Sequence, residues 1–274
     1  MKKSFLYLAL GAISLSTLNS CEELENLCDI QESDLGTGDV FVTSLNHMVD
    51  IYKRVDAASK DPLVTGTGST VIDGAKCFKS ADTDTLYIDF GVSEVICADG
   101  KLRKGLIWAY LIGDYNQPNG EVSAELENYF VDGTQITGDI DAKNNGPAAD
   151  PDFSITTTSF IVEGESNVDY TLGALWEQGF TTAEPSDDIF NVSGTVSGND
   201  TKNNKSFSST VIEPLHYVNA CADGIEKGRM DIDLISDTTI AITIDFIESD
   251  GCNNLFEVSV DCQGSPISFT YPMN

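Results

Sequence analysis

One stretch of the sequence, residues 85–107, gathers side chains that could do chemistry at close spacing. It carries Asp89-Phe90-Gly91, then Cys97, and then a turn rich in basic residues. Basic turns stand out in a chain with 44 acidic and only 15 basic residues. We therefore predict a ligand or partner site in this turn. An exposed aromatic residue at the end of a later strand is a further candidate contact. The candidate residues are Asp99, Lys101, Arg103, Lys104 and Trp176.

Nucleophilic catalysis lacks its usual residues in this sequence. A Ser-His-Asp site needs a histidine as its base, and we expect the only two histidines, His47 and His216, to be structural. Glycoside hydrolysis would need two carboxylates across a cleft, for which Asp89 and Asp245 are candidates because they recur at matching places. An aspartate at a strand end more often accepts N–H groups of a turn. We assign no catalytic residue, and the balance favours a protein that is not an enzyme.

Two oxygen-rich segments suit calcium better than any other cation. The first offers Asp114 and Asn116, although Pro118 stands where a further ligand belongs. The second is a predicted turn that offers Asp139 and Asp141. Calcium is therefore the one cofactor considered, and no other is expected.

Aromatic side chains with polar neighbours suit a carbohydrate. Trp108 and Tyr110 share one face of a predicted strand by parity, and we expect that face to be the core. The further aromatic candidates are Tyr115, Tyr129 and Trp176.

The first 20 residues predict an export signal, since Lys2 and Lys3 precede an apolar run at 5–15. The following Leu18-Asn19-Ser20-Cys21 resembles a lipobox, in which the chain is cut before Cys21 and this cysteine receives the lipid. Several acyl chains make such an anchor durable. The acidic cluster at 22–25 resembles the surface-export signal of Bacteroidota lipoproteins. We therefore expect a lipid-anchored protein of the outer membrane, displayed on the cell surface.

The formal net charge of -29 excludes nucleic acid as a partner, because such a surface repels phosphate backbones. The expected partners are the membrane, through the anchor, and a glycan, an apolar ligand or another envelope protein. The leading expectation is a non-catalytic binding or structural role. Two alternatives stay open: a carrier of an apolar ligand, and a carbohydrate-binding or carbohydrate-processing accessory protein.

Hydrophobic periodicity predicts one amphipathic helix followed by strands only. The helix is expected at 39–59, capped by Asp39 and stopped by Asp61-Pro62, after a tether at 21–37. About a dozen short strands follow, and Asp132-Gly133 marks a tight hairpin. Short connections favour an all-β antiparallel meander, either one curved sheet or a sandwich. One β-rich domain is therefore expected over 38–274.

A degenerate internal repeat subdivides this domain. The strand ending at Asp89-Phe90 and the strand ending at Asp245-Phe246 are each followed by a cysteine and preceded by another. We expect repeat units at roughly 77–142 and 221–271, with a central meander at 153–213. If the units are equivalent, Cys77 pairs with Cys97, Cys221 with Cys252, and Cys28 with Cys262. A local staple from Cys252 to Cys262 is the rival pairing.

The ordered pattern resembles the uncharacterised β-rich lipoproteins of Bacteroidota. It rests on Ile88-Asp89-Phe90-Gly91, Cys97, Asp99-Gly100, Arg103-Lys104-Gly105, Tyr110, Asn128-Tyr129-Phe130-Val131, Pro214-Leu215, Cys221, Asp245 and Cys252. Ile247 and Asn253 depart from it, where the family has glycine and aspartate. The resemblance implies a β-rich fold and an envelope location, and it carries no activity.

Overall fold

The computed structural model describes residues 31–66, 68–178, 188–218, 221, 225–235, 240–247, 255–262 and 265–273. The helices are α2 (Glu32–Lys60) and the short α3 (Pro62–Thr65). The strands are β1 (Ser69–Ile72), β2 (Ala75–Lys79), β3 (Thr85–Ile96), β4 (Leu102–Ile112), β5 (Glu121–Val131), β6 (Thr134–Asn144), β7 (Asp152–Val162), β8 (Ser166–Gln178), β9 (Ile189–Asp200), β10 (Lys205–Val218), β11 (Ile225–Ile235), β12 (Ile240–Phe246), β13 (Leu255–Cys262) and β14 (Ser265–Pro272).

All 14 strands form one antiparallel sheet in which each strand pairs with its neighbours in sequence. This confirms the predicted all-β meander with one long helix. It also decides between the two predicted architectures in favour of a single curved sheet, since no described strand belongs to a second sheet. The Asp132-Gly133 hairpin is confirmed as well, because both residues have positive φ and join the paired strands β5 and β6.

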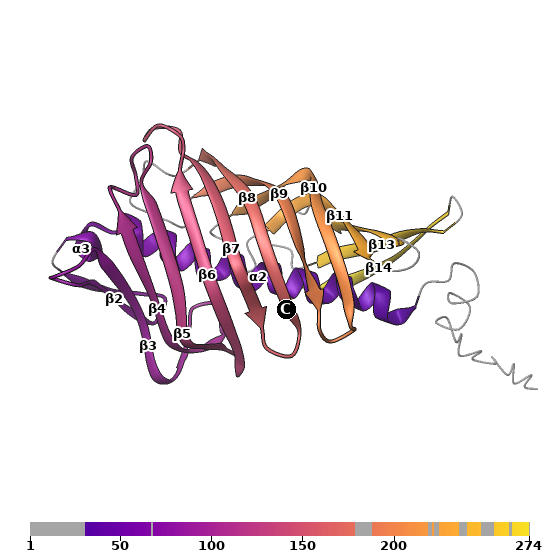
Figure 1. The fold of residues 1–274 in the computed structure, drawn as a ribbon, viewed down its shortest axis with the longest axis horizontal. Coiled ribbons are helices and arrows are strands. Elements are labelled where there is room, and N and C mark those ends of the chain that lie inside the picture. The colour runs from indigo at the N-terminus through magenta and orange to yellow at the C-terminus, as the bar shows by residue number, and fades with distance from the viewer. Residues whose placement is uncertain are drawn as a thin grey trace, which may run out of the picture.

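Helix α2 lies along the concave side of the sheet, which curls around it (Figure 1). Its side chains are buried on almost every side, and Phe41, Leu45 and Met48 are among the largest fully buried residues. The Phe41 ring meets Phe207 of β10 edge to face at 5.5 Å. Each such side chain, fully buried, contributes about 1.5–3 kcal/mol. The sheet and the helix therefore share one hydrophobic core.

The helix begins earlier than the sequence predicts. It includes residues 32–37, which were expected to be tether, and the predicted cap Asp39 lies within it. Its first turn is stabilised instead by Asp34, whose Oδ2 accepts the N–H of Gln31 at 2.8 Å. Gly36 and Gly38 do not interrupt the helix. A Cβ at Gly38 would lie 3.3 Å from Val258, so this glycine lets α2 approach β13 closely. The predicted stop is confirmed, because α2 ends before Asp61-Pro62.

A line of β-bulges crosses strands β3 to β7, and we call it the bulge line. Register breaks fall at corresponding places in the pairs β3–β4, β4–β5, β5–β6, β6–β7 and β7–β8. Residues of positive φ mark it: Gly91, Gly105, Asn128, Gly138 and Ser159. Bulges bend the strand that carries them and increase its twist. The bulge line thus lets strands of 11–13 residues wrap around α2.

Among the described residues, no helix is long and apolar enough to cross a membrane.

Candidate functional site

The basic turn predicted to meet a partner buries one of its basic residues, Arg103, whereas Asp99, Lys101 and Lys104 are half-buried. Arg103, the first inward residue of β4, has no exposed surface. Its guanidinium donates to Asp99 at 2.8 and 2.5 Å and to Asp50 of α2 at 2.9 Å. Arg54 of α2 completes this buried ion cluster by pairing with Asp50 and Asp73. The prediction of an exposed contact is therefore wrong for Arg103, because its charge is neutralised inside the fold.

The buried ion cluster shifts the pKa values of its members. Burial opposes ionisation of Asp50, but the charges of Arg54 and Arg103 outweigh it and lower the pKa of Asp50 to about 2. Burial also opposes ionisation of Arg54 and Arg103, but the carboxylates of Asp50, Asp73 and Asp99 outweigh it and raise the pKa of both arginines. Nearby, burial together with Lys101 and Arg103 lowers the pKa of His47 to about 4. At neutral pH the members of the buried ion cluster are therefore charged and paired, and the neighbouring His47 is neutral. This is the pattern of a cluster that stabilises the fold.

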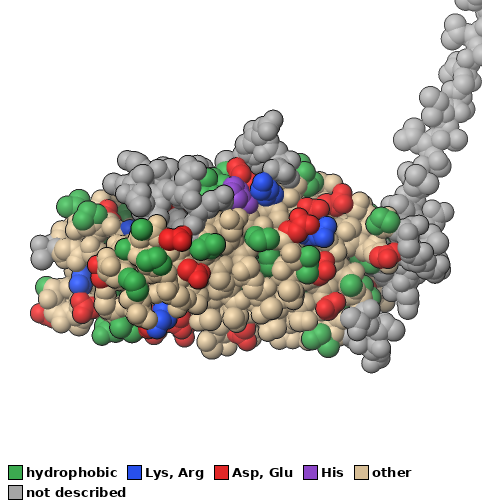
Figure 2. All heavy atoms as spheres, turned by 90° about the horizontal axis from the view of Figure 1, so that it is seen from above, with side chains coloured by type: hydrophobic (Ala, Val, Ile, Leu, Met, Phe, Trp, Pro, Cys, Tyr) green, Lys and Arg blue, Asp and Glu red, His purple; other side chains and the backbone are tan. Residues whose placement is uncertain are grey.

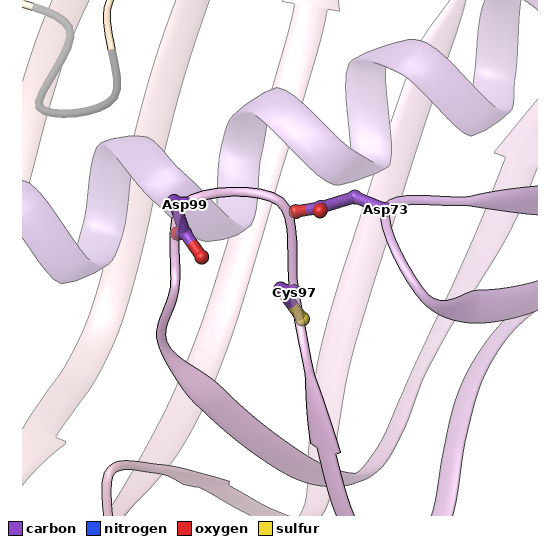
Figure 3. A group of neighbouring side chains, drawn as sticks. All are labelled: Asp73, Cys97 and Asp99. Atoms are coloured by element: carbon purple, nitrogen blue, oxygen red, sulfur yellow. The ribbon is translucent and has the colours of Figure 1, made fainter.

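Asp73, Cys97 and Asp99 form the one group of described residues with metal-like spacing (Figure 3), their ligand atoms lying within 4.8 Å of one another. Those atoms already have partners. Both oxygens of Asp99 accept from Arg103, and Asp73 accepts from Arg54 and from the N–H of Ala98 at 2.6 Å. Burial raises the pKa of the Cys97 thiol. Because two guanidinium groups occupy the carboxylates, we assign no metal to this group.

The calcium candidates are spread over two places. Asp114 accepts the N–H of Asn116 at 3.0 Å in the turn after β4. Asp139 and Asp141 were expected in a turn, but they lie within β6, opposite Glu125 and Ser123 of β5. Their side chains are exposed on the outer face of the sheet. Neither pair belongs to a metal-like group among the described residues.

The expected pairing of Cys77 with Cys97 is wrong, since both thiols are free. Cys77 lies in β2 opposite Ile88 of β3. Cys97 follows Ile88 by nine residues and lies beyond the bulge line, beside Gly74. The repeat is also inexact, because Cys221 follows β10 and is not inside a strand. Cys28, Cys252 and the side chain of Cys262 lie outside the described residues, so the other two pairings stay predictions.

The recurring aspartates, Asp89 and Asp245, each lie opposite a basic residue of the preceding strand. Asp89 lies opposite Lys76, and Asp245 lies opposite Arg229. Asp89 also accepts the N–H of Gly91 at 2.8 Å, which is the turn-capping role that the sequence favours. Burial raises the pKa of Asp245. These residues lie on different strands far apart in the sheet order, so they do not form a carboxylate pair.

Trp108 and Tyr110 share a face, as parity predicts, but the face is the outer one. The residues between and beside them, Ile107, Ala109 and Leu111, point into the core. Trp108 is half-buried and Tyr110 is 45% exposed. The prediction that this pair belongs to the core is wrong because both faces of β4 are apolar, and alternation alone does not tell which one is covered.

An aromatic row crosses the outer face of β2, β3 and β4. Phe78 stacks on Tyr87, with ring centroids 5.1 Å apart, and Tyr87 lies opposite Trp108 in the β3–β4 register. Lys76 lies over the ring of Phe78, at the β2 end of the row, with its Nζ 5.3 Å from the ring centroid. Two other aromatic candidates do not reach this face, since Tyr115 and Tyr129 are buried. The side chain of Trp176 lies outside the described residues.

A pocket of about 460 Å³ opens beside this row, at the bulge line, and we call it the bulge pocket. Its polar side chains are Asp89, Lys104, Glu127 and Asn128, and its apolar ones are Val92, Leu106 and Phe130. Lys104 lies over the Phe130 ring at 4.6 Å and 4.0 Å from Glu94. Of the predicted basic turn, Lys104 therefore reaches an exposed site, whereas Lys101 is half-buried and does not line the pocket.

Sequence reasoning missed Leu106, Glu127, Asn128 and Phe130 as members of one site. They meet because the bulge line brings β3, β4 and β5 together there. Gly105 is the local signal, since its Cβ would lie 2.1 Å from the carbonyl oxygen of Asn128. Only glycine permits that approach.

Comparison with known proteins gives no relative: no family model, no curated protein and no solved structure matches this chain.

Proposed function

We propose that this chain is a non-catalytic carbohydrate-binding lipoprotein, whose ligand lies on the outer face of the sheet at the bulge pocket. One observation carries the proposal: the aromatic row of Phe78, Tyr87 and Trp108 lies beside a pocket that offers carboxylate, amide and amine groups. A sugar ring has an apolar face and a polar edge. Aromatic rings suit the first, and a few well-placed polar groups fix the orientation of the second.

The charge around the site narrows the class of glycan. Asp89 and Glu127 outnumber Lys104 in the pocket, and Glu125 lies opposite Trp108. The whole chain carries a net charge of -29, and acidic side chains are spread over the surface seen in Figure 2. A field of this sign repels phosphate, sulfate and uronate groups. The ligand is therefore a neutral or amine-bearing glycan.

The concave face does not support the alternative of an apolar-ligand carrier. A carrier needs an interior that the ligand can enter, and here α2 fills the concave side with fully buried side chains such as Phe41, Leu45 and Met48. We expect a fluorescent fatty acid to show no saturable binding. Saturable micromolar binding of that probe would favour the carrier instead.

The proposal includes an acyl anchor on Cys21 and display at the cell surface, as the sequence at 18–25 predicts. Mass spectrometry of the mature N-terminus should find acyl groups on Cys21, and Cys21→Ala should release the protein from membranes. Protease added to intact cells should degrade the wild-type protein. Protection until the outer membrane is opened would place it on the periplasmic face.

The binding test starts with the full-length mature protein in detergent on an array of neutral, amine-bearing and anionic glycans. A positive glycan is then titrated by calorimetry, a readout that does not depend on the tryptophan that the variant replaces. We expect Trp108→Ala to weaken binding about tenfold, which corresponds to about 1.4 kcal/mol. Ile235→Ala removes an exposed apolar side chain from β11, far from the site in the sheet order, and should leave affinity unchanged.

Two results would reject the proposal. One is the absence of any glycan that binds at millimolar concentration. The other is a bound glycan whose affinity is the same for the wild type and for Trp108→Ala.

A further inference from the structure

A second pocket, of about 480 Å³, lies on the outer face near the other end of β4, and we call it the distal pocket. Its outward side chains come from four neighbouring strands, β4 to β7, and include Ile112, Glu121, Ser123, Asp141, Lys143 and Thr156. Lys143 pairs with Glu121 at 2.6 Å, while Asp141 has an exposed side chain. The distal pocket thus combines apolar, carboxylate and hydroxyl groups, as the bulge pocket combines apolar and polar ones.

Strand β4 connects the two pockets. Its outward residues alternate with the buried ones, in the order Leu106, Trp108, Tyr110 and Ile112. Leu106 lines the bulge pocket and Ile112 lines the distal pocket. Six residues of strand span about 20 Å. Between the pockets, therefore, the outer face of β4 carries two consecutive aromatic side chains.

Strand β5 places a polar row alongside this apolar row. In the β4–β5 register, Leu106 lies opposite Glu127, Trp108 opposite Glu125, Tyr110 opposite Ser123, and Ile112 opposite Glu121. Each apolar residue of the β4 row thus has a carboxylate or hydroxyl beside it, and we call the two rows together the extended track. A linear glycan repeats the same two features, an apolar ring face and a hydroxyl edge, from one sugar to the next.

We propose that the ligand is an extended, linear glycan that lies along β4 and fills both pockets at once. This rests on the proposed function and deepens it, because a single sugar would need only one pocket. The carboxylates of the polar row along β5 repel the phosphate groups of an anionic membrane surface or of a nucleic acid. The occupant is therefore a chain of neutral or amine-bearing sugars.

The test is a length series of one β-linked neutral oligosaccharide and of its amine-bearing counterpart, from one sugar to about eight, titrated by calorimetry into the full-length mature protein. We expect affinity to rise at least tenfold from the monosaccharide to a plateau, because longer chains reach the second pocket. The double variant Ile112→Ala/Asp141→Asn changes exposed side chains of the distal pocket. It should remove most of that gain and leave the affinity of the shortest bound sugar unchanged.

The outcomes separate the two proposals. Equal affinity for every length would overturn the extended track and leave a single-sugar site standing. An equal loss for short and long chains in the double variant would also overturn it. No binding at any length, with glycans of either kind, would reject the carbohydrate function itself. Ile235→Ala serves again as the exposed control on β11.

Discussion

Arg103 joins the sheet to the helix through charge. Its guanidinium binds Asp99 in the turn between β3 and β4 and Asp50 of α2, with no exposed surface. Arg103→Met keeps a similar volume but leaves those carboxylates with one partner fewer inside the fold. Breaking a buried ion pair in this way costs about 3–5 kcal/mol. We expect a loss of this size in the free energy of unfolding, measured with urea.

The neighbouring Lys104 provides the matched control, since it carries the same charge on the half-exposed outer face. Lys104→Met should change the free energy of unfolding by less than about 1 kcal/mol, as exposed pairs do. If Arg103→Met proved equally mild, the buried ion cluster would contribute little to stability.

His47 makes stability depend on pH. Its pKa in the folded protein, about 4, lies below the ordinary value of 6.5, with burial the main cause and Lys101 and Arg103 adding to it against Asp50 and Asp132. Between these two values the unfolded chain binds more protons than the folded one. The free energy of unfolding should therefore fall as pH drops from 6.5 toward 4.

The measurement is urea unfolding at pH 7 and pH 5 for the wild type and for His47→Gln. The variant should lose about 2 kcal/mol less than the wild type between these values. Comparing the two proteins cancels Asp56 and Asp245, whose raised pKa values act in the opposite direction. Identical slopes would show that His47 is already protonated in the folded state at pH 5.

At the scale of elements, the bulge line depends on two glycines in different circumstances. Gly105 has φ +99, and a Cβ there would lie 2.1 Å from the Asn128 carbonyl oxygen. Gly91 has φ +79, but no other atom lies within 4 Å of the position that a Cβ would take there. Alanine at Gly91 therefore adds only backbone strain, of about 1 kcal/mol, whereas alanine at Gly105 must also push β4 and β5 apart.

Gly105→Ala should accordingly destabilise the protein by at least about 2 kcal/mol more than Gly91→Ala, in thermal or urea unfolding. It should also weaken glycan binding, because the bulge pocket lies at this contact. Equal effects of the two substitutions would mean that the strands separate at little cost.

Local chemistry explains which elements the sequence could predict. The Asp132-Gly133 turn and the stop at Asp61-Pro62 depend on neighbours in the chain, and both are confirmed. The start of α2 was misjudged because Gly36 and Gly38 usually disfavour a helix. Here Gly38 packs against Val258, which is distant in sequence and therefore invisible to a local pattern.

The same distinction holds for the candidate site. The sequence identifies Lys104 and Trp108 as candidate residues by their types. It does not predict their surroundings, because the position of α2 decides which face of β4 is the core. Likewise, Arg103 finds its partner Asp50 in that helix. Face and burial are tertiary properties, so an apolar strand such as β4 gives no local signal for its outer side.

At the scale of the whole molecule, α2 binds the two ends of the sheet together. It contacts β1, β3 and β4 on one side and β8, β9 and β12 on the other. Polar contacts reinforce this along the helix: Thr37 donates to Asp200 at 2.7 Å, Tyr170 donates to Ser44 at 2.8 Å, and Lys60 pairs with Asp188 at 2.6 Å. Neither predicted repeat unit could therefore bury its concave face without the helix.

This arrangement predicts one cooperative unit, although the sequence suggests two repeats. Native-state hydrogen exchange should give α2, β4 and β12 similar opening free energies with the same dependence on urea, since global unfolding exposes them together. Thr37→Val, which removes a helix–sheet hydrogen bond near one end, should lower all three by a similar amount of about 1 kcal/mol. If β11–β14 opened at a much lower free energy than β4–β8, the second repeat would be an independent unit docked on the first. The extended glycan track would then belong to the first unit alone, because β4 and β5 carry both of its rows.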